Sequence, residues 1–133
     1  MELSDYLALQ NKRKRPHRSE EADIQISVVA WLKAKYPDVL FTMSPAGVKM
    51  SIGQAVKMKK MGYRSGTPDL LIDRAVGRWH GLRVEIKTDM GIASPEQLQW
   101  QRKATAEGYC SLITRGLNKT KEAIQDYLEG RVL

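Results

Sequence analysis

Residues 66–88 read GTPDLLIDRAVGRWHGLRVEIKT, in which two short apolar runs flank a segment rich in turn-forming residues. This pattern predicts two strands, residues 69–73 and 82–88, joined as a hairpin. Successive side chains of a strand point to opposite faces, so Glu85 and Lys87 share one face and Ile86 takes the other. The second strand therefore carries an acid and a base side by side.

The first run adds a second carboxylate, Asp69, directly after Pro68. Proline's missing N–H donor is tolerated at a strand start, and Gly66 can take a backbone conformation that aims Asp69. Magnesium and manganese ions prefer oxygen ligands, and magnesium is commonly held by one or two carboxylates with waters and phosphate oxygens. Asp69 and Glu85 suit that role. Lys87 suits an ammonium that positions the attacking water or offsets developing negative charge.

A Glu-x-Lys triplet alone is also typical of the solvent-exposed face of an amphipathic strand, so the interpretation depends on a longer string. That string comprises an acidic helix start at residues 20–25, the turn Gly66-x-Pro68-Asp69, Glu85-x-Lys87, Gly91 and Ser94-x-x-Gln97. It resembles the virus-type replication-repair nuclease domain, VRR-NUC, a branch of the PD-(D/E)XK restriction-endonuclease-like superfamily. The resemblance extends from about residue 20 to about residue 114.

The resemblance implies an α/β fold, a three-layer sandwich in which helices flank a mixed central sheet. It also implies that Asp69 and Glu85 bind Mg²⁺ or Mn²⁺, that Lys87 is the catalytic lysine, and that a glutamate of the first helix completes the acidic cluster. Gln97 would support this site, and a main-chain carbonyl near Ile86 is a further candidate ligand. Stand-alone domains of this family are implied to cleave branched DNA, especially four-way junctions, as symmetric homodimers in phage or bacterial replication or repair.

Two assignments within this site stay open. Glu20 and Glu21 both lie in the expected first turn, where any acid stabilises a helix, and helical spacing does not separate them; we favour Glu21. Gln97 can act as the cap partner of Ser94 or can orient a metal-bound water, and the two roles are compatible.

Charge predicts an anionic partner. The 133-residue chain is of single-domain length and carries a net charge of +7 with a pI of about 9.6. We expect residues 1–18 to be a basic arm and residues 19–133 to be the nuclease domain. The cations expected to contact DNA phosphates are Lys12, Arg13, Lys14, Arg15 and Arg18 in the arm, and Lys49, Lys57, Lys60 and Arg64 around a later helix. The alternatives are a disordered tail and a solvated helix face.

Several classes of protein are disfavoured. A single cysteine, Cys110, excludes an intrachain disulfide and is expected to be a small buried hydrophobe. No apolar stretch approaches the length of a membrane span and no signal peptide is apparent, so we expect a cytoplasmic protein without a membrane partner, in a bacterium or a phage-infected host.

The remaining elements follow from periodicity and capping residues. Ser19 is expected to cap a helix that ends before residue 36, Ser51 a helix that ends at Gly62, and Ser94 a helix with a Pro95–Gln97 capping box that stops at Gly108. Strands are expected at residues 39–43 and 109–114, and a closing helix at 118–129. Trp31 and Trp100 are expected in the core, whereas the position of Trp79 at a hairpin tip is ambiguous.

The leading hypothesis is a metal-dependent DNA endonuclease that acts on branched DNA. One alternative is a nuclease for linear or flapped DNA, because the metal site does not determine which DNA shape is bound. The other is a non-catalytic DNA-binding module of the same fold; its mark would be a missing catalytic residue, and none is missing here.

Overall fold

The computed structural model describes residues 2, 16–45 and 48–132, with the backbone alone at residues 16–19. Helices and strands alternate in the order expected from the sequence. They are α2 (Pro16–Lys35), β1 (Phe41–Met43), α3 (Ile52–Lys60), β2 (Leu70–Ile72), β3 (Leu82–Lys87), α4 (Pro95–Ala106), β4 (Cys110–Arg115) and α5 (Leu117–Leu128). The chain is therefore α/β, as predicted.

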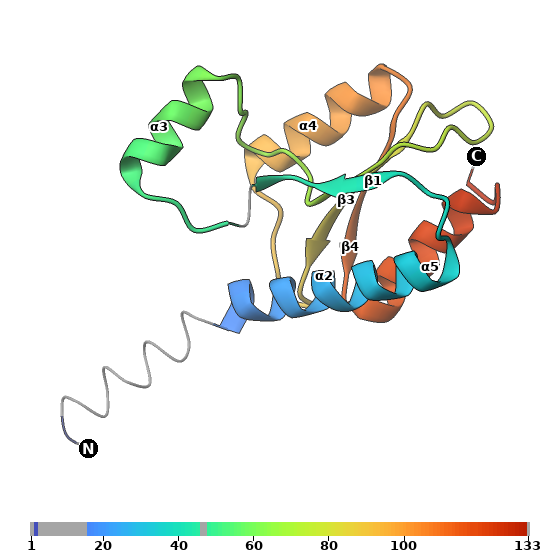
Figure 1. Ribbon diagram of the computed structural model, residues 1–133, viewed down its shortest axis with the longest axis horizontal. Helices are drawn as coiled ribbons and strands as arrows, with labels where there is room; N and C mark the ends of the chain where they lie inside the picture. Colours follow the sequence, from blue (N-terminus) through green and yellow to red (C-terminus); the bar gives the residue numbers. More distant parts are fainter. Residues whose placement is uncertain (1, 3–15, 46–47, 133) are drawn as a thin grey trace.

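The four strands form one mixed sheet in the order β1-β2-β3-β4. β2 pairs antiparallel with both neighbours, and its register with β3, Leu70 opposite Val84 and Ile72 opposite Leu82, confirms the predicted hairpin. β4 lies parallel to β3, as it must when α4 forms the crossover between them. Figure 1 shows α2 and α5 together on one side of the sheet and α4 on the other, which is the expected three-layer arrangement.

The core lies between the sheet and the pair α2 and α5. Val28 and Leu32 from α2 are fully buried, and they meet Ile86 of β3 and Tyr127 of α5 in the same cluster. The Tyr127 hydroxyl satisfies its hydrogen bond inside the core by donating to the Arg74 carbonyl at 2.6 Å. Cys110 is buried as expected. Within the described ranges, no helix combines the length and apolar character that a membrane span requires.

The predicted caps of α3 and α4 are confirmed. Ser51 and Gln54 form a complete capping box at the start of α3, and Ser94 and Gln97 form one at the start of α4. Each serine side chain accepts the N3 backbone N–H, while the N3 glutamine accepts the N–H of the serine. These local signals fix both helix starts.

The predicted start of the first helix is wrong. α2 begins at Pro16, so Ser19 lies inside the helix and is not its N-cap. Proline has a φ suited to the first helical turn and lacks an N–H that would be unpaired there, so the helix can start at this residue. Residues 16–18 of the expected arm therefore belong to α2. The strand predicted at 39–43 is also shorter, because the Val39 N–H bonds back to the Tyr36 carbonyl at 3.1 Å in the preceding turn.

Candidate active site

Asp69 lies where the turn after α3 enters β2, and its side chain reaches the neighbouring strand. The Ile86 N–H donates to Asp69 Oδ2 at 2.7 Å, and the Ser44 N–H donates to the Asp69 carbonyl at 3.0 Å. The turn itself is packed against the start of α4. Gly66 has a φ of +90°, and a Cβ there would lie 2.4 Å from the Glu96 carbonyl oxygen, so only glycine fits. Gly66 therefore has a backbone conformation that other residues disfavour, as predicted.

Glu85 and Lys87 are both buried, with exposed fractions of 6% and 8%. Lys87 Nζ lies 3.5 Å from Glu85 Oε1, and the same oxygen accepts a 2.6 Å hydrogen bond from Gln97 Nε2. Glu85 Oε2 is buried and has no hydrogen-bond partner among the described residues. The alternative interpretation of this triplet, an exposed Glu-x-Lys pair on the solvent face of an amphipathic strand, is therefore wrong.

Gln97 serves the helix cap and Glu85 with different atoms. Its Oε1 accepts the Ser94 N–H at 2.9 Å, while its Nε2 donates to Glu85. The cap role left open by the sequence is thus present. The amide nitrogen additionally fixes the position of the buried carboxylate.

The carboxylates open into a cavity of about 1030 Å³, lined by α2, β1 and the residues around β3. Glu21 and Lys87 line this cavity, whereas Glu20 is exposed and does not. Glu21 is therefore the acid of α2 that lies near the site. Within the described ranges, no three His, Cys, Asp or Glu side chains gather closely enough to hold one ion. The candidate metal ligands at this site are therefore the two carboxylates of Asp69 and Glu85.

Comparison with known proteins settles the family. A solved structure described as a "VRR_NUC domain protein" is similar to this chain with a TM-score of 0.73 and 32% sequence identity, over 84% of this chain and 89% of that chain. The chain belongs to the VRR-NUC family. No protein-family model matches the chain, and none of the curated proteins does. As a VRR-NUC member it is a nuclease domain, and the restriction-endonuclease-like fold expected from the sequence is confirmed.

The electrostatics of this VRR-NUC site favour a cation. Burial and, to a lesser extent, the nearby Asp69 carboxylate raise the pKa of Glu85 to about 8, although Lys87 opposes the shift. Burial also raises the pKa of Asp69, against the lowering effect of the Ile86 N–H and of Lys87. One lysine therefore does not fully compensate two buried carboxylates.

The structure describes only some of the cations predicted to contact DNA. Lys12, Arg13, Lys14 and Arg15 lie outside the described residues, and Arg18 is described only as part of the α2 backbone. Lys49, Lys57 and Lys60 are exposed. The last two lie on α3, which has no buried residue and projects from the domain in Figure 1. Arg64 lies in the turn between α3 and Gly66 and lines a second cavity.

Tyr63 is a neighbour of the site that the sequence did not predict. Gly62, with a φ of +111°, ends α3, and the Tyr63 N–H donates back to the Met58 carbonyl at 2.9 Å. Burial raises the pKa of Tyr63, and the charges of Glu85 and Asp69 raise it further. The phenol thus lies within electrostatic range of both carboxylates. In the sequence, Gly62 indicates where the helix ends. It does not indicate how far that end lies from Asp69 in the folded protein.

Proposed function

We propose that this VRR-NUC domain is a Mg²⁺- or Mn²⁺-dependent endonuclease that hydrolyses DNA phosphodiesters. The observation that carries the proposal is Glu85 Oε2, a buried carboxylate oxygen that has no hydrogen-bond partner among the described residues and lies in the same cavity as Asp69. A buried carboxylate oxygen without a hydrogen-bond partner is costly, and a divalent cation bound to it would compensate that cost. The donor set fits a hard cation, because Asp69 and Glu85 supply oxygens only.

In this proposal Asp69, Glu85 and the Ile86 carbonyl hold the ion, and Glu21 binds its waters or a second ion. Two carboxylates suffice for magnesium when waters and substrate phosphate oxygens complete the coordination. A bound ion polarises the phosphoryl oxygen and lowers the pKa of bound water. The Ile86 N–H, through its 2.7 Å hydrogen bond to Oδ2, holds the Asp69 carboxylate in place for this role.

Lys87 and Gln97 have separate tasks. Lys87 lines the carboxylate cavity beside Glu85, so its ammonium can offset the negative charge that develops on the phosphate during attack. Gln97 contacts the Glu85 carboxylate and positions it. Because its amide oxygen is already used by the Ser94 N–H, Gln97 orients Glu85 chiefly through its nitrogen.

The positive charge of the chain supports DNA as the substrate. A net charge of +7 favours a polyanion, and the exposed Lys49, Lys57 and Lys60 lie on the segment that leads into the Asp69 turn. Such contacts to phosphates orient the DNA without reading its sequence. The basic residues 12–15 would add further phosphate contacts.

The proposal extends to a symmetric homodimer that acts on branched DNA. β1 is an edge strand of the sheet, and the apolar side chains of Met43 in this strand and of Leu40 just before it are exposed by 47% and 69%. Exposed edges with apolar side chains commonly pair with another chain. A two-fold dimer would present two active sites to two strands, as four-way junction cleavage requires.

The test compares cleavage of a labelled four-way junction, a flap and a linear duplex in Mg²⁺, Mn²⁺ or EDTA. We expect the wild type to cleave the junction fastest and only with metal, and Asp69→Asn and Lys87→Ala to lose most activity. Cleavage in EDTA, or full activity of Asp69→Asn, would reject the mechanism. Cleavage of linear duplex as fast as the junction would reject the branched-DNA assignment alone.

A further inference from the structure

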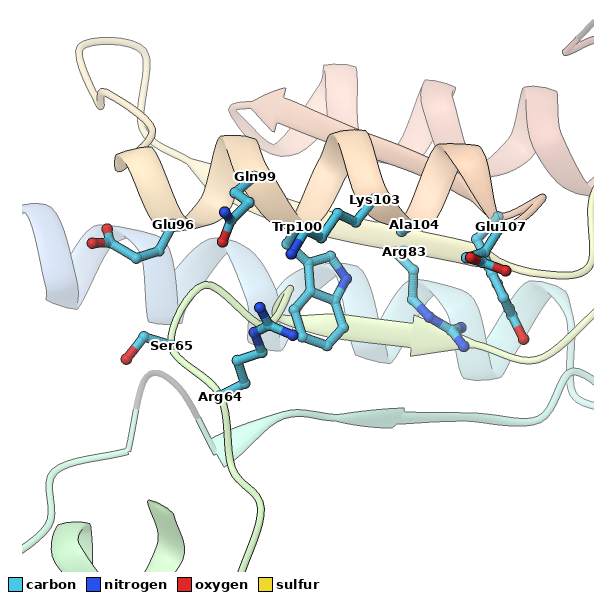
Figure 2. Close-up of a pocket in the computed structure, with 10 residues that line it drawn as sticks. Arg64, Ser65, Arg83, Glu96, Gln99, Trp100, Lys103, Ala104 and Glu107 are labelled. Atoms are coloured by element: carbon cyan, nitrogen blue, oxygen red, sulfur yellow. The ribbon is translucent and has the colours of Figure 1, made fainter. Parts of the chain in front are cut away.

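A second cavity, of about 340 Å³, runs along α4 next to the candidate active site. Figure 2 shows its walls, and the side chains that carry the argument below are Arg64 from the turn, Arg83 from β3, Trp100 and Lys103 from α4, and Tyr109. We call this cavity the Trp100 groove.

The Trp100 groove and the carboxylate cavity are built on the same two segments. Arg64 and Glu96 line the groove, whereas Asp69 and Gln97, which follow them closely in the turn and in α4, line the carboxylate cavity. The two segments touch at Gly66, whose hypothetical Cβ would meet the Glu96 carbonyl oxygen at 2.4 Å. The groove and the carboxylate cavity are therefore neighbours on the surface of the domain.

Trp100 supplies a flat aromatic surface in this groove. The expectation that Trp100 belongs to the core is wrong, because α4 has no fully buried residue and the ring is only partly covered. Its indole Nε1 has no hydrogen-bond partner in the described part of the chain. The ring is thus held by packing alone, and its free surface faces the groove.

Two acids, Glu96 and Glu107, and three basic side chains line the groove, and the basic side chains fall into two kinds. Arg83 is already engaged, since its Nη1 lies 3.2 Å from Asp73 and its guanidinium lies 4.6 Å from the centre of the Tyr109 ring. Arg64 and Lys103 line the groove, and no side-chain hydrogen bond or ion pair of theirs occurs within the described ranges. Two available cations beside a half-buried indole that lines a groove form a combination that can bind single-stranded nucleic acid, by base stacking and phosphate contacts.

We propose that the Trp100 groove receives an unpaired nucleobase of the DNA substrate, which stacks on Trp100 while Arg64 and Lys103 contact the adjacent phosphates. The proposal rests on the proposed nuclease function, because the base belongs to the strand held at Asp69 and Glu85. A base inside a duplex has both faces covered by its neighbours and does not offer this stacking surface. The groove therefore favours substrates with a base that is unpaired next to the cleaved bond, as in a flap or in a four-way junction whose central base pairs open.

The test measures binding in EDTA of a fluorescein-labelled duplex with a single-stranded overhang and of the same duplex with blunt ends. We expect Trp100→Ala to weaken binding of the overhang duplex by between about fivefold and a hundredfold, the usual range for one stacked base. Binding of the blunt duplex should stay within about twofold, and Trp100→Phe should restore most of the overhang affinity because it keeps an aromatic face. A 2-aminopurine in the overhang should lose fluorescence on binding to the wild type and not to Trp100→Ala.

Lys103→Ala provides a second variant at an exposed position, with Arg102→Ala on the same helix, outside the groove lining, as its matched control. Lys103→Ala should weaken overhang binding several-fold more than Arg102→Ala. Equal losses for overhang and blunt duplex, or no loss in Trp100→Ala and Lys103→Ala, would overturn the inference. If the wild type cleaves no DNA in Mg²⁺ or Mn²⁺, the proposed function fails; if it cleaves DNA while Trp100→Ala binds both duplexes normally, the inference alone fails.

Discussion

Gln97 joins the cap of α4 to Glu85: its Nε2 donates to the Glu85 carboxylate at 2.6 Å while its Oε1 accepts the Ser94 N–H at 2.9 Å. The start of a helix and the position of a buried carboxylate therefore depend on one side chain. The equivalent residue of α3, Gln54, makes the same cap, with its Oε1 accepting the Ser51 N–H at 3.1 Å, and has no carboxylate partner among the residues that the structure describes.

The pair of capping boxes gives a matched experiment. Gln54→Ala should lower the free energy of unfolding by about 0.5–1 kcal/mol, as loss of a cap contact does. Gln97→Ala should cost about 1–3 kcal/mol, because it removes the cap contact and also a charge-assisted hydrogen bond to a buried carboxylate. Urea unfolding in EDTA measures both. Equal losses in the two variants would mean that the contact with Glu85 contributes nothing.

The pKa of Glu85 predicts how stability depends on pH in the absence of metal. The ordinary pKa of a glutamate is 4.5, and burial and then Asp69 raise that of Glu85 to about 8 in the folded state. Between these pH values the folded protein binds more protons than the unfolded chain, so the free energy of unfolding falls as the pH rises from about 4.5 to about 8.

Glu85→Gln should remove this contribution and keep an acceptor for Gln97. We expect the variant to be more stable than the wild type at pH 8 in EDTA and similar to it near pH 4.5, with Glu122→Gln, an exposed position on α5, as the control. Urea unfolding at the two pH values decides the matter. A wild type and a Glu85→Gln variant with the same pH dependence would show that Glu85 is not the group that titrates.

Gly66 should be intolerant of a side chain. Its φ of +90° is strained for any other residue, and a Cβ would lie 2.4 Å from a backbone oxygen, so Gly66→Ala should cost at least about 2 kcal/mol and displace Asp69. Gly53, the second residue of α3, has nothing within 4 Å of its hypothetical Cβ, and Gly53→Ala should stabilise the protein by about 0.5–1 kcal/mol. Thermal unfolding compares the two. If Gly66→Ala unfolded at the same temperature as the wild type, the close packing of the turn against α4 would not contribute to stability.

Lys57 and Lys60 on α3 should contribute to DNA binding through phosphates alone. Replacing both with alanine should weaken binding to all DNA sequences alike and reduce the slope of log K against log salt by about one per lost contact. Lys119→Ala, an exposed lysine on α5, is the control. Fluorescence anisotropy at several salt concentrations measures the slope, and an unchanged slope would remove α3 from the interface.

The N-terminal residues can be tested in the same way, with the deletion ending before α2 begins at Pro16. Removal of residues 1–15 takes away Lys12, Arg13, Lys14 and Arg15 and leaves that helix start intact. It should weaken DNA binding and its salt dependence while leaving metal binding unchanged. A deletion without effect on the salt slope would indicate a passive tail.

The features that could be predicted from the sequence are those encoded locally. The hairpin follows from two apolar runs and their alternation, and both capping boxes follow from a serine and a glutamine at fixed spacing. Gly66 was predictable because a turn before Pro68 calls for its conformational freedom. The first helix start was not, since Pro16 and Ser19 are both good helix starts and only the folded chain selects between them.

The features that could not be predicted depend on contacts between distant segments. The alternation of side chains along β3 places Glu85 and Ile86 on different faces of the sheet. Only the position of α4 with its Gln97 decides that Glu85 is buried and not solvated. Trp100 has the spacing of a core residue, yet α4 packs so that its ring lines a groove. The proximity of Tyr63 to the carboxylates likewise depends on where α3 ends in space.

The central claim is that Asp69 and Glu85 together bind a divalent cation, and titration of the metal-free protein with Mn²⁺ by isothermal calorimetry tests it most directly. We predict saturable binding by the wild type, weakened more than about tenfold in Asp69→Asn and in Glu85→Gln and unchanged in Glu122→Gln. Binding of Mn²⁺ to Asp69→Asn and Glu85→Gln with the affinity of the wild type would contradict the claim.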